Sequence, residues 1–319
     1  MESDLLHTLS AYGGRGWSPR KKSLREEAGR LWGRFGQSTE WAALKTVLLH
    51  RPGPELSTTQ DPETVQMLAR LDAEKARGQH AALARAYIQN GVEVVYVEPG
   101  ETGFPNQMFV ADLMFMTPEG AVLARPASTV RAGEERWIAR RLADLGVPIL
   151  KSIRGRGTFE GADALWIDPA TVLLGRGLRT NAEGAKQVTD LLLEMSVRVI
   201  QVDLPCGTMH LMGMLRFIDR SLALAWPGRL AHTAVLALRD RGFAVHFIPD
   251  ELEAIRGFAL NFVTIGPRKI LMPAGNPNTQ AFYEDLGITC LTVDVGELIK
   301  AAGAIGCLTG IIEREPTSI

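Results

Sequence analysis

The chain has 319 residues, a length that corresponds to one large domain or two domains of ordinary size. Hydrophobic residues make up 46% and charged residues 22%, a balance that excludes a disordered or collagen-like chain. With 35 basic and 36 acidic residues the formal net charge is -1, and this lack of a basic excess argues against nucleic acid as a partner.

The cysteine count and the length of the apolar runs predict the cellular compartment of the protein. Three cysteines, Cys206, Cys290 and Cys307, are too few for a disulfide framework and fit a reducing compartment. The first residues lack the basic flank and apolar core of a secretory signal, and no run of 18 apolar residues occurs. We therefore expect a cytoplasmic protein without a membrane span.

The first 44 residues differ in composition from the rest. The segment GGRGWSPRKK is rich in Gly, Pro and Arg, which is typical of a mobile or surface-lying segment. Ser23–Gly36 is predicted to form a short amphipathic helix. We expect residues 1–44 to be an N-terminal extension and residues 45–319 to be one catalytic domain.

From residue 45 the pattern predicts a strand, a long helix and a second strand, at Thr46–His50, Val65–Asn90 and Val92–Val97. A repeated unit then follows, built of a two-stranded hairpin, a helix and a third strand. The hairpins begin about every 50 residues, at Leu113, Ala164, Met214 and Asn261. The helices between hairpin and third strand are expected at Glu134–Leu145, Ala182–Met195, Leu230–Arg241 and Thr279–Leu286. A last strand begins near Leu308 and is expected to pair with Thr46–His50.

Five units of one design predict a closed ring, an α/β fold in the form of a five-bladed α/β-propeller of ββαβ units. Radial closure leaves only short sheet edges. The alternative is an open α/β sheet of ordinary βαβ units, but the two-stranded hairpins argue against it.

Reactive side chains occur at similar positions of different repeats. Asp112, Glu160 with Asp163, and His210 come shortly before three first strands, and Cys307 precedes the last strand. In a ring of repeats such positions converge on the axis. A thiolate is a strong nucleophile, an imidazole shuttles protons, and carboxylates bind a planar cation such as guanidinium. Taken together, the set indicates an enzyme that attacks a cationic carbon.

Other candidate residues fit structural roles better. Cys206 and Cys290 are interpreted as packing residues. The remaining histidines lie at other positions of the repeat, and His80 has no second ligand at helical spacing to form a metal site. The two GRG segments lack the spacing of a phosphate-binding loop.

The motifs resemble those of the guanidino-group-modifying enzymes with the pentein fold, especially the dimethylarginine dimethylaminohydrolases and arginine deiminases. The likeness covers about residues 45–315 and rests on PNQMFVAD (105–112), TVRAGE (129–134), FEGADAL (159–165), GRGLRTNAEG (175–184), MHLMG (209–213) and DVGELIKAAGAIGC (294–307). It implies a five-bladed α/β-propeller with the active site at its centre.

The resemblance also implies roles for individual residues. Cys307 would be the nucleophile and His210 the general acid and base, while Glu160 and Asp112 would hold the guanidinium. The residues assigned to substrate binding are Arg131 and Arg179, for the substrate carboxylate, and Phe109, Asn106 and Asp163. No metal or organic cofactor belongs to this chemistry.

The substrate-reading positions depart from the resemblance. Dimethylarginine enzymes carry an acidic residue in place of Asn106 and a glutamate in place of Ala111. Arginine deiminases share the asparagine, but they carry an arginine in place of Ala111 and an aspartate in place of Met212. The catalytic set is thus retained, while the set that selects the substrate is mixed.

The sequence therefore predicts a hydrolase that cleaves a C–N bond of a guanidino compound, such as arginine or a methylated arginine, through a covalent thiouronium on cysteine. The partner is a small molecule, and a homodimer is an open expectation. Two alternatives stand beside this hypothesis: an amidinotransferase on the same scaffold, and a propeller that binds a partner without catalysis.

Overall fold

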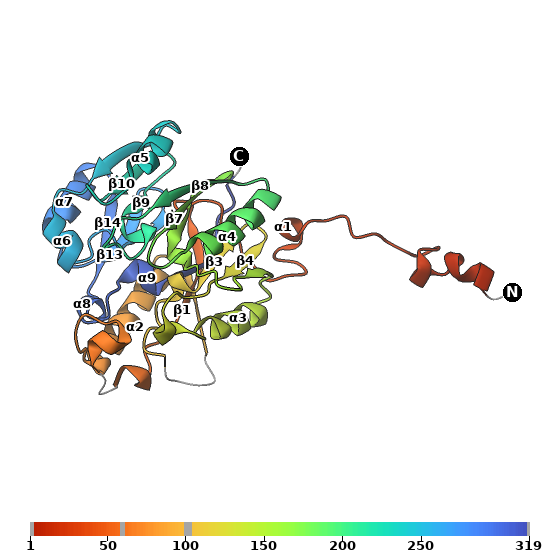
Figure 1. Cartoon of the computed structure of the whole chain (residues 1–319), viewed down its shortest axis with the longest axis horizontal. Coiled ribbons are helices and arrows are strands. Elements are labelled where there is room, and N and C mark those ends of the chain that lie inside the picture. Colours follow the sequence, from red (N-terminus) through yellow and green to blue (C-terminus); the bar gives the residue numbers. More distant parts are fainter. Residues whose placement is uncertain (1–2, 58–60, 99–103, 318–319) are drawn as a thin grey trace.

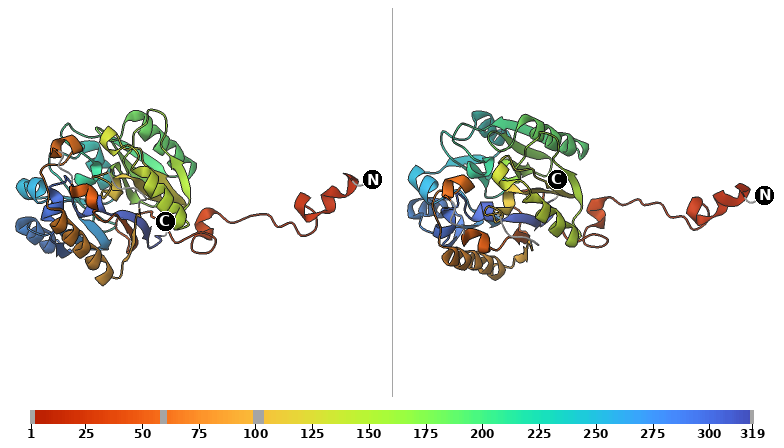
Figure 2. Two further views of the ribbon diagram at one scale, coloured as in Figure 1. Left: turned by 90° about the horizontal axis from the view of Figure 1, so that it is seen from below. Right: turned by 60° about the horizontal axis from the view of Figure 1, so that its bottom comes forward.

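The computed structural model describes residues 3–57, 61–98 and 104–317. Five three-stranded sheets are arranged as the blades of a propeller, with the longer helices on the outside (Figures 1 and 2). This confirms the predicted five-bladed α/β-propeller. Within the described residues, no helix is long and apolar enough to cross a membrane.

Every sheet has the same order, in which the first and second strands pair antiparallel and the second and third pair parallel. The first strands are β15 (Gly310–Arg314), β3 (Met114–Thr117), β6 (Ala164–Asp168), β9 (Leu215–Phe217) and β12 (Val263–Gly266). The second strands are β1 (Leu44–Leu49), β4 (Gly120–Leu123), β7 (Thr171–Arg176), β10 (Leu222–Ala225) and β13 (Lys269–Pro273). The third strands are β2 (Glu93–Tyr96), β5 (Ile149–Ser152), β8 (Arg198–Asp203), β11 (Ala244–Phe247) and β14 (Thr289–Val293).

A helix joins the second strand of each sheet to the third, because a parallel pair needs a crossover connection. These helices are α2 (Ala73–Gln89), α3 (Glu135–Asp144), α4 (Ala182–Glu194), α5 (His232–Arg239) and α7 (Pro277–Asp285). The shorter helices are α1 (Leu24–Glu27), α6 (Glu251–Arg256), α8 (Gly296–Ile299) and α9 (Ile305–Leu308). The antiparallel pairing of β15 with β1 closes the ring, as the sequence predicted.

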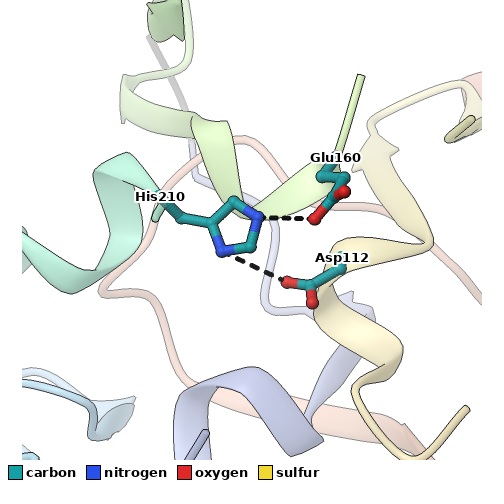
Figure 3. Close-up of side chains that lie close together, drawn as sticks. All are labelled: Asp112, Glu160 and His210. Carbon is teal, nitrogen blue, oxygen red and sulfur yellow. Dashed lines mark hydrogen bonds and ion pairs between the residues drawn. The ribbon is translucent and has the colours of Figure 1, made fainter. Parts of the chain in front are cut away.

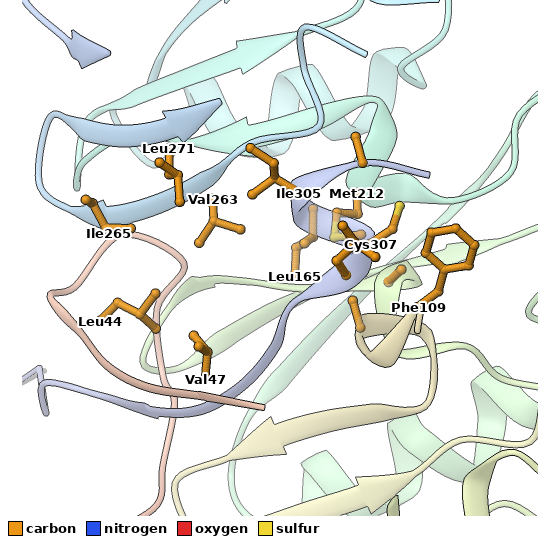
Figure 4. Close-up of a cluster of buried hydrophobic side chains, with 14 of the residues drawn as sticks. Leu44, Val47, Phe109, Leu165, Met212, Val263, Ile265, Leu271, Ile305 and Cys307 are labelled. Carbon is orange, nitrogen blue, oxygen red and sulfur yellow. The ribbon is translucent and has the colours of Figure 1, made fainter. Parts of the chain in front are cut away.

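The core lies at the centre of the ring. First strands such as β3 and β6 are almost wholly buried, whereas third strands such as β2 and β5 are half-exposed. Figure 4 shows part of the central cluster, in which Leu165, Met212 and Ile305 surround Cys307. The apolar strands thus place the predicted nucleophile on the axis of the propeller.

Two predicted elements differ from the structure. The helix predicted over Val65–Asn90 begins only at Ala73, because Asp72 caps it through the backbone N–H groups of Glu74 and Lys75. The helix predicted over Ser23–Gly36 is reduced to α1, which ends before Gly29, a residue with a φ of 72°.

The N-terminal segment extends away from the propeller, and residues 13–22 are mostly exposed (Figure 1). From Phe35 the chain is buried, and Gly36 pairs with Glu313 beside β15. The division into an extension of 44 residues and a domain over 45–319 stays a prediction, and burial begins about ten residues before that boundary.

Candidate active site

Short helical turns bring the predicted catalytic residues to the axis. Asp112 ends the single turn Val110–Asp112, Glu160 immediately precedes the turn Gly161–Asp163, and His210 precedes Leu211–Gly213. Each turn leads into the first strand of a sheet, so the turns of three repeats converge, with Glu160 and His210 before their turns and Asp112 at the end of its own. All three side chains are at least nine-tenths buried.

His210 lies between the two carboxylates (Figure 3). Its Nε2 is 2.7 Å from Oε2 of Glu160, and its Nδ1 is 3.7 Å from Oδ1 of Asp112. Burial alone would lower the pKa of His210, but these carboxylates and Asp163 outweigh burial and raise the pKa to about 9. The same ion pair, with two arginines nearby, lowers the pKa of Glu160 to about 2 against the opposing effect of burial. At neutral pH His210 is therefore an imidazolium beside the ionised carboxylate of Glu160.

Arg131 is buried among acidic side chains. Its Nη1 donates to Oδ2 of Asp112 at 2.6 Å, and its Nε donates to Oε2 of Glu134 at 2.9 Å. Its Nη2 reaches the backbone carbonyls of Asn106 and Phe109, each at 3.4 Å. Burial opposes the charge, but the three acidic neighbours raise the pKa of Arg131.

Arg131 was expected to bind the substrate carboxylate. In the structure every nitrogen of its guanidinium already donates to an acceptor of the protein. Binding of a substrate carboxylate by Arg131 stays a prediction and requires these bonds to be exchanged. Arg179 has more freedom, because within the described part of the chain its guanidinium contacts only Glu160, with Nη1 3.3 Å from Oε1.

Asp163 holds the backbone that carries His210. Its Oδ1 accepts from the N–H of Leu211 at 3.0 Å, and its Oδ2 accepts from the hydroxyl of Thr180 at 2.6 Å. Burial raises the pKa of Asp163 to about 6, although His210 and these bonds oppose the shift. The contacts fit a positioning residue, while direct binding of substrate by Asp163 stays a prediction.

Cys307 precedes the last strand, as predicted, but it lies in the helical turn α9, and β15 begins only at Gly310. Asn261 binds it from both ends: Nδ2 donates to Sγ at 3.0 Å, and Oδ1 accepts from the N–H of Cys307 at 3.2 Å. Burial and the nearby Asp112 raise the pKa of the Cys307 thiol, against the opposing effects of Asn261 and Arg216. The resting site thus favours a neutral thiol.

The two glycines before the nucleophile allow a close approach of neighbouring side chains. A Cβ on Gly303 would lie 2.3 Å from the ring of Phe109, and a Cβ on Gly306 would lie 1.9 Å from Nη2 of Arg216. These glycines therefore fix Phe109 against the Cys307 segment and let the Arg216 guanidinium lie directly beneath it.

Two cavities meet at the thiol. A small polar cavity of about 20 Å³ is lined by Gln66, Asn106, Phe109, Asp112, Arg131, Arg179, Met209, Ala301, Ala302 and Cys307. A larger and mostly apolar cleft of about 370 Å³ contains both His210 and Cys307 in its wall. Asp112 lines the polar cavity, and among the described residues its buried Oδ1 accepts no hydrogen bond, although it lies 3.7 Å from Nδ1 of His210. An acceptor and a nucleophile thus face one space, as binding and attack of a guanidinium require.

The carboxylates and His210 also resemble a metal-binding set, since one ligand atom from each of Asp112, Glu160 and His210 lies within 4.8 Å of the others. Arg131 already supplies a cation to Asp112, with 2.6 Å between the charged atoms, so a metal ion would have to share this space with a guanidinium. The arrangement therefore fits an organic cation better than a metal ion.

Sequence reasoning missed several residues of the site. Asn261 lies at the start of the hairpin predicted for the fourth repeat, close to the axis. Its position within the repeat could therefore have identified it as a residue of the site. Arg216 and Glu134 gave no signal, because their roles depend on burial against Cys307 and Arg131. The remaining cysteines lie elsewhere: Cys206 is exposed, and burial raises the pKa of Cys290 to about 12.

Comparisons with known proteins agree with this geometry. N(G),N(G)-dimethylarginine dimethylaminohydrolase of Pseudomonas aeruginosa is 29% identical over 251 residues, covering 78% of this chain and 93% of the relative. The enzyme of the same name from Streptomyces coelicolor is 29% identical over 265 residues, covering 83% and 96%. The solved Pseudomonas aeruginosa enzyme, a Cys-to-Ser mutant complexed with citrulline, has a TM-score of 0.70 at 26% identity and covers 84% of this chain and 98% of its own.

A solved amidinotransferase of saxitoxin biosynthesis from Microseira wollei shares the fold, with a TM-score of 0.72 at 14% identity. The sequence model of arginine deiminase matches residues 56–255, which is more than half of the chain. The chain therefore belongs to the arginine deiminase family and is an amidine hydrolase, as the resemblance in its sequence predicted.

Proposed function

We propose that this protein hydrolyses a C–N bond of an arginine-like guanidino substrate through a covalent thiouronium on Cys307, and releases an amine and a ureido product. One observation carries the proposal: Asp112, whose Oδ1 accepts no hydrogen bond from the described residues, and the buried Cys307 line the same cavity. The solved relative complexed with citrulline supports a ureido product.

Substrate binding favours ionisation of the Cys307 thiol. Burial and the charge of Asp112 keep the pKa of Cys307 raised in the free protein. A guanidinium bound to Asp112 offsets that charge and places a second cation beside the sulfur, and both effects favour the thiolate. The nucleophile is therefore activated by its own substrate.

His210 then handles the protons. As an imidazolium it donates a proton to the departing nitrogen when the carbon–sulfur bond has formed and the carbon–nitrogen bond breaks. The neutral imidazole next accepts a proton from water, which attacks the thiouronium carbon and displaces the sulfur. Glu160 holds His210 at 2.7 Å and stabilises its charged form, so the ring remains oriented through both steps.

Recognition of the far end of the substrate is proposed for the arginines. Arg179 presents donors beyond its one contact with Glu160 and is the stronger candidate for a carboxylate. Phe109 and Asn106 line the polar cavity beside it. Because this cavity holds little more than one water-sized group, the amino-acid end enters it only if surrounding side chains move. The expected cytoplasmic location and homodimer stay predictions.

The test is a product screen by mass spectrometry over arginine, methylated arginines, agmatine and guanidino acids. Wild-type protein is expected to form a ureido product from at least one of them. Cys307→Ser should lose more than about 90% of the rate, a barrier increase above ~1.4 kcal/mol, while the exposed Cys206→Ser is the matched control. A Cys307→Ser variant that retains more than a tenth of the rate overturns the nucleophile assignment.

The amidinotransferase alternative predicts a different product. An added amine such as glycine would then raise turnover and yield a new guanidino compound instead of a ureido compound. The binding-protein alternative predicts no turnover and an alkylation rate of Cys307 that no guanidine affects.

A further inference from the structure

The larger cleft adjoins the reacting groups, and neither Arg131 nor Arg179 is part of its lining. Asp112, Arg131 and Arg179 line the polar cavity, whereas His210 lines the cleft, and Cys307 lines both. Since His210 protonates the departing nitrogen in the proposed mechanism, that nitrogen faces the cleft. Whatever substituent the leaving amine carries must therefore extend into it.

The walls of this cleft are apolar and adaptable. They include Met209, Met212, Trp226, Ile255, Phe258 and Leu260. Among the described residues that line the cleft, Arg229 and the imidazolium of His210 are the charged ones, and Arg229 lies 4.8 Å over the ring of Trp226. Methionine and aromatic side chains bind apolar groups of varied shape, and they offer no partner to a charged amine.

The volume of the cleft exceeds the needs of a small leaving group. It measures about 370 Å³, whereas a molecule the size of water or ammonia needs only about 10–15 Å³ by the same measure. The value falls within the range of pockets that hold drug-sized ligands, about 300–1,000 Å³. Ammonia or methylamine would leave most of this apolar surface uncovered.

Backbone strain is concentrated at the same place. The described non-glycine residues with positive φ are Gln66, Ser196, Phe258, Arg268 and Ala302. Phe258, with a φ of 52°, and Ala302, with a φ of 70°, line the cleft, and Gln66 lines the polar cavity. A bulky residue in this conformation is disfavoured, and such outliers cluster at binding sites because the fold holds them there. The ring of Phe258 is thus kept at the cleft despite a cost to the backbone.

We infer that the cleft binds the leaving group of the reaction, and that the preferred substrate is a guanidine whose departing nitrogen carries an apolar alkyl or aryl substituent of several carbons. This inference rests on the proposed hydrolysis. The sulfur–carbon bond of the thiouronium forms, the bond from carbon to the substituted nitrogen breaks, His210 supplies the proton, and an apolar primary amine leaves. Water then replaces sulfur on carbon, which restores the thiol and releases the ureido product.

The first test measures kcat/KM for Nω-methyl-, Nω-butyl- and Nω-benzyl-arginine, with quantification of the released amine. Burial of one methylene contributes up to ~0.8 kcal/mol, which is about fourfold, so the half-open cleft should give about two- to fourfold per methylene. We expect Nω-butylarginine to exceed Nω-methylarginine by about 10- to 60-fold over three methylenes. Hydrolysis that is fastest for the methyl compound overturns the inference and leaves the hydrolase proposal intact.

A binding measurement separates the inference from the reaction itself. N-Benzylguanidine should protect Cys307 from iodoacetamide at a concentration at least about tenfold lower than N-methylguanidine, since the phenyl ring adds apolar area. Protection of this kind without turnover of any guanidine supports the cleft and overturns the hydrolase proposal. Equal protection by the two compounds overturns the cleft.

Variants test whether the preference for apolar substituents arises from the cleft. Phe258→Gly removes the ring and relieves the backbone, so folding should be preserved while the benzyl-to-methyl ratio of kcat/KM falls by about tenfold. Ser196→Gly makes the same backbone change on the exposed turn after α4 and should leave the ratio unchanged. Ile255→Asp at the exposed rim should also lower the ratio, whereas Leu193→Asp on the exposed face of α4 should not. A ratio that both cleft variants leave unchanged contradicts the inference.

Discussion

Asn261→Ala should raise the pKa of the Cys307 thiol. The amide Nδ2 donates to the sulfur at 3.0 Å in a buried site, and a hydrogen bond to a charged group contributes about 1.5–3 kcal/mol. At ~1.4 kcal/mol per tenfold change, loss of this donor should lower the thiolate fraction at neutral pH, and with it the rate of alkylation, about 10- to 100-fold.

The assay is the rate of iodoacetamide alkylation followed by intact mass across neutral to alkaline pH. Cys206→Ser and Cys290→Ser are included in every sample, so that Cys307 is the sole thiol. Asn261→Ala also frees the N–H of Cys307, which should cost about 1–3 kcal/mol of unfolding free energy.

Asn276→Ala provides the matched control, because Asn276 is equally buried and binds the backbone carbonyls of Gly257 and Pro273. It should lower the thermal midpoint without moving the alkylation profile. An alkylation profile that is the same in Asn261→Ala and the parent protein would refute the assignment of Asn261 as the donor that stabilises the thiolate.

Four further predictions concern protons and substrate. His210→Asn should let the covalent adduct accumulate on Cys307 in a quenched reaction, since water activation loses its base; a variant that hydrolyses at the normal rate removes His210 from the mechanism. The pKa of His210 is raised to about 9, so its contribution to stability is fully present below about pH 6.5 and is lost as pH rises through about 9. The urea midpoint of the wild-type protein should fall over this alkaline range. If the midpoint of His210→Asn falls equally, the loss of stability does not arise from His210. Arginine should exceed agmatine by about 10- to 1,000-fold in kcat/KM if Arg179 binds a carboxylate, and Arg179→Lys should narrow that gap. Ala111 stands where the dimethylarginine enzymes carry a glutamate, so the site lacks a negative charge that would attract the α-ammonium group of an amino-acid substrate. 4-Guanidinobutyrate, which has no such group, should therefore reach about a tenth of the arginine rate or more. No turnover of 4-guanidinobutyrate would contradict this reasoning.

The ring of five sheets was predictable because each repeat carries its own local signals. Turn residues separate short apolar strands, and apolar residues at helical spacing follow each hairpin. The positions of Asp112, Glu160 and His210 followed from the phase of the repeat. A shared phase in the sequence becomes a shared place in space once the ring closes through β15 and β1.

Other features depend on contacts that no local signal carries. The segment before Ala73 is not helical, because the N–H groups of Leu68 and Ala69 bind the carbonyl of Lys300, more than 200 residues away in the sequence. Arg131 was expected to bind the substrate, and in the structure Asp112 and Glu160 from two other turns converge on it, together with Glu134 three residues along the chain. The pairing with Asp112 and Glu160 appears only when the turns are placed in space.

The helical turn at Cys307 has a similar origin. Two glycines and the β-branched Ile305 give GAIGC (303–307) a low helix propensity, and no helix was predicted there before the strand expected from near Leu308. The N–H of Gly306 binds the carbonyl of Asn261, and the Asn261 side chain holds Cys307 from both ends. Tertiary hydrogen bonds therefore determine the local conformation of the nucleophile.

The most direct test of the central claim is a reaction in ¹⁸O-labelled water, with the ureido product and the intact protein analysed by mass spectrometry. Hydrolysis through Cys307 predicts one heavy oxygen in the ureido group and an amidino adduct on the peptide that contains Cys307, both absent from Cys307→Ser. A product that contains no heavy oxygen, or a labelled product formed equally by Cys307→Ser, would contradict the account.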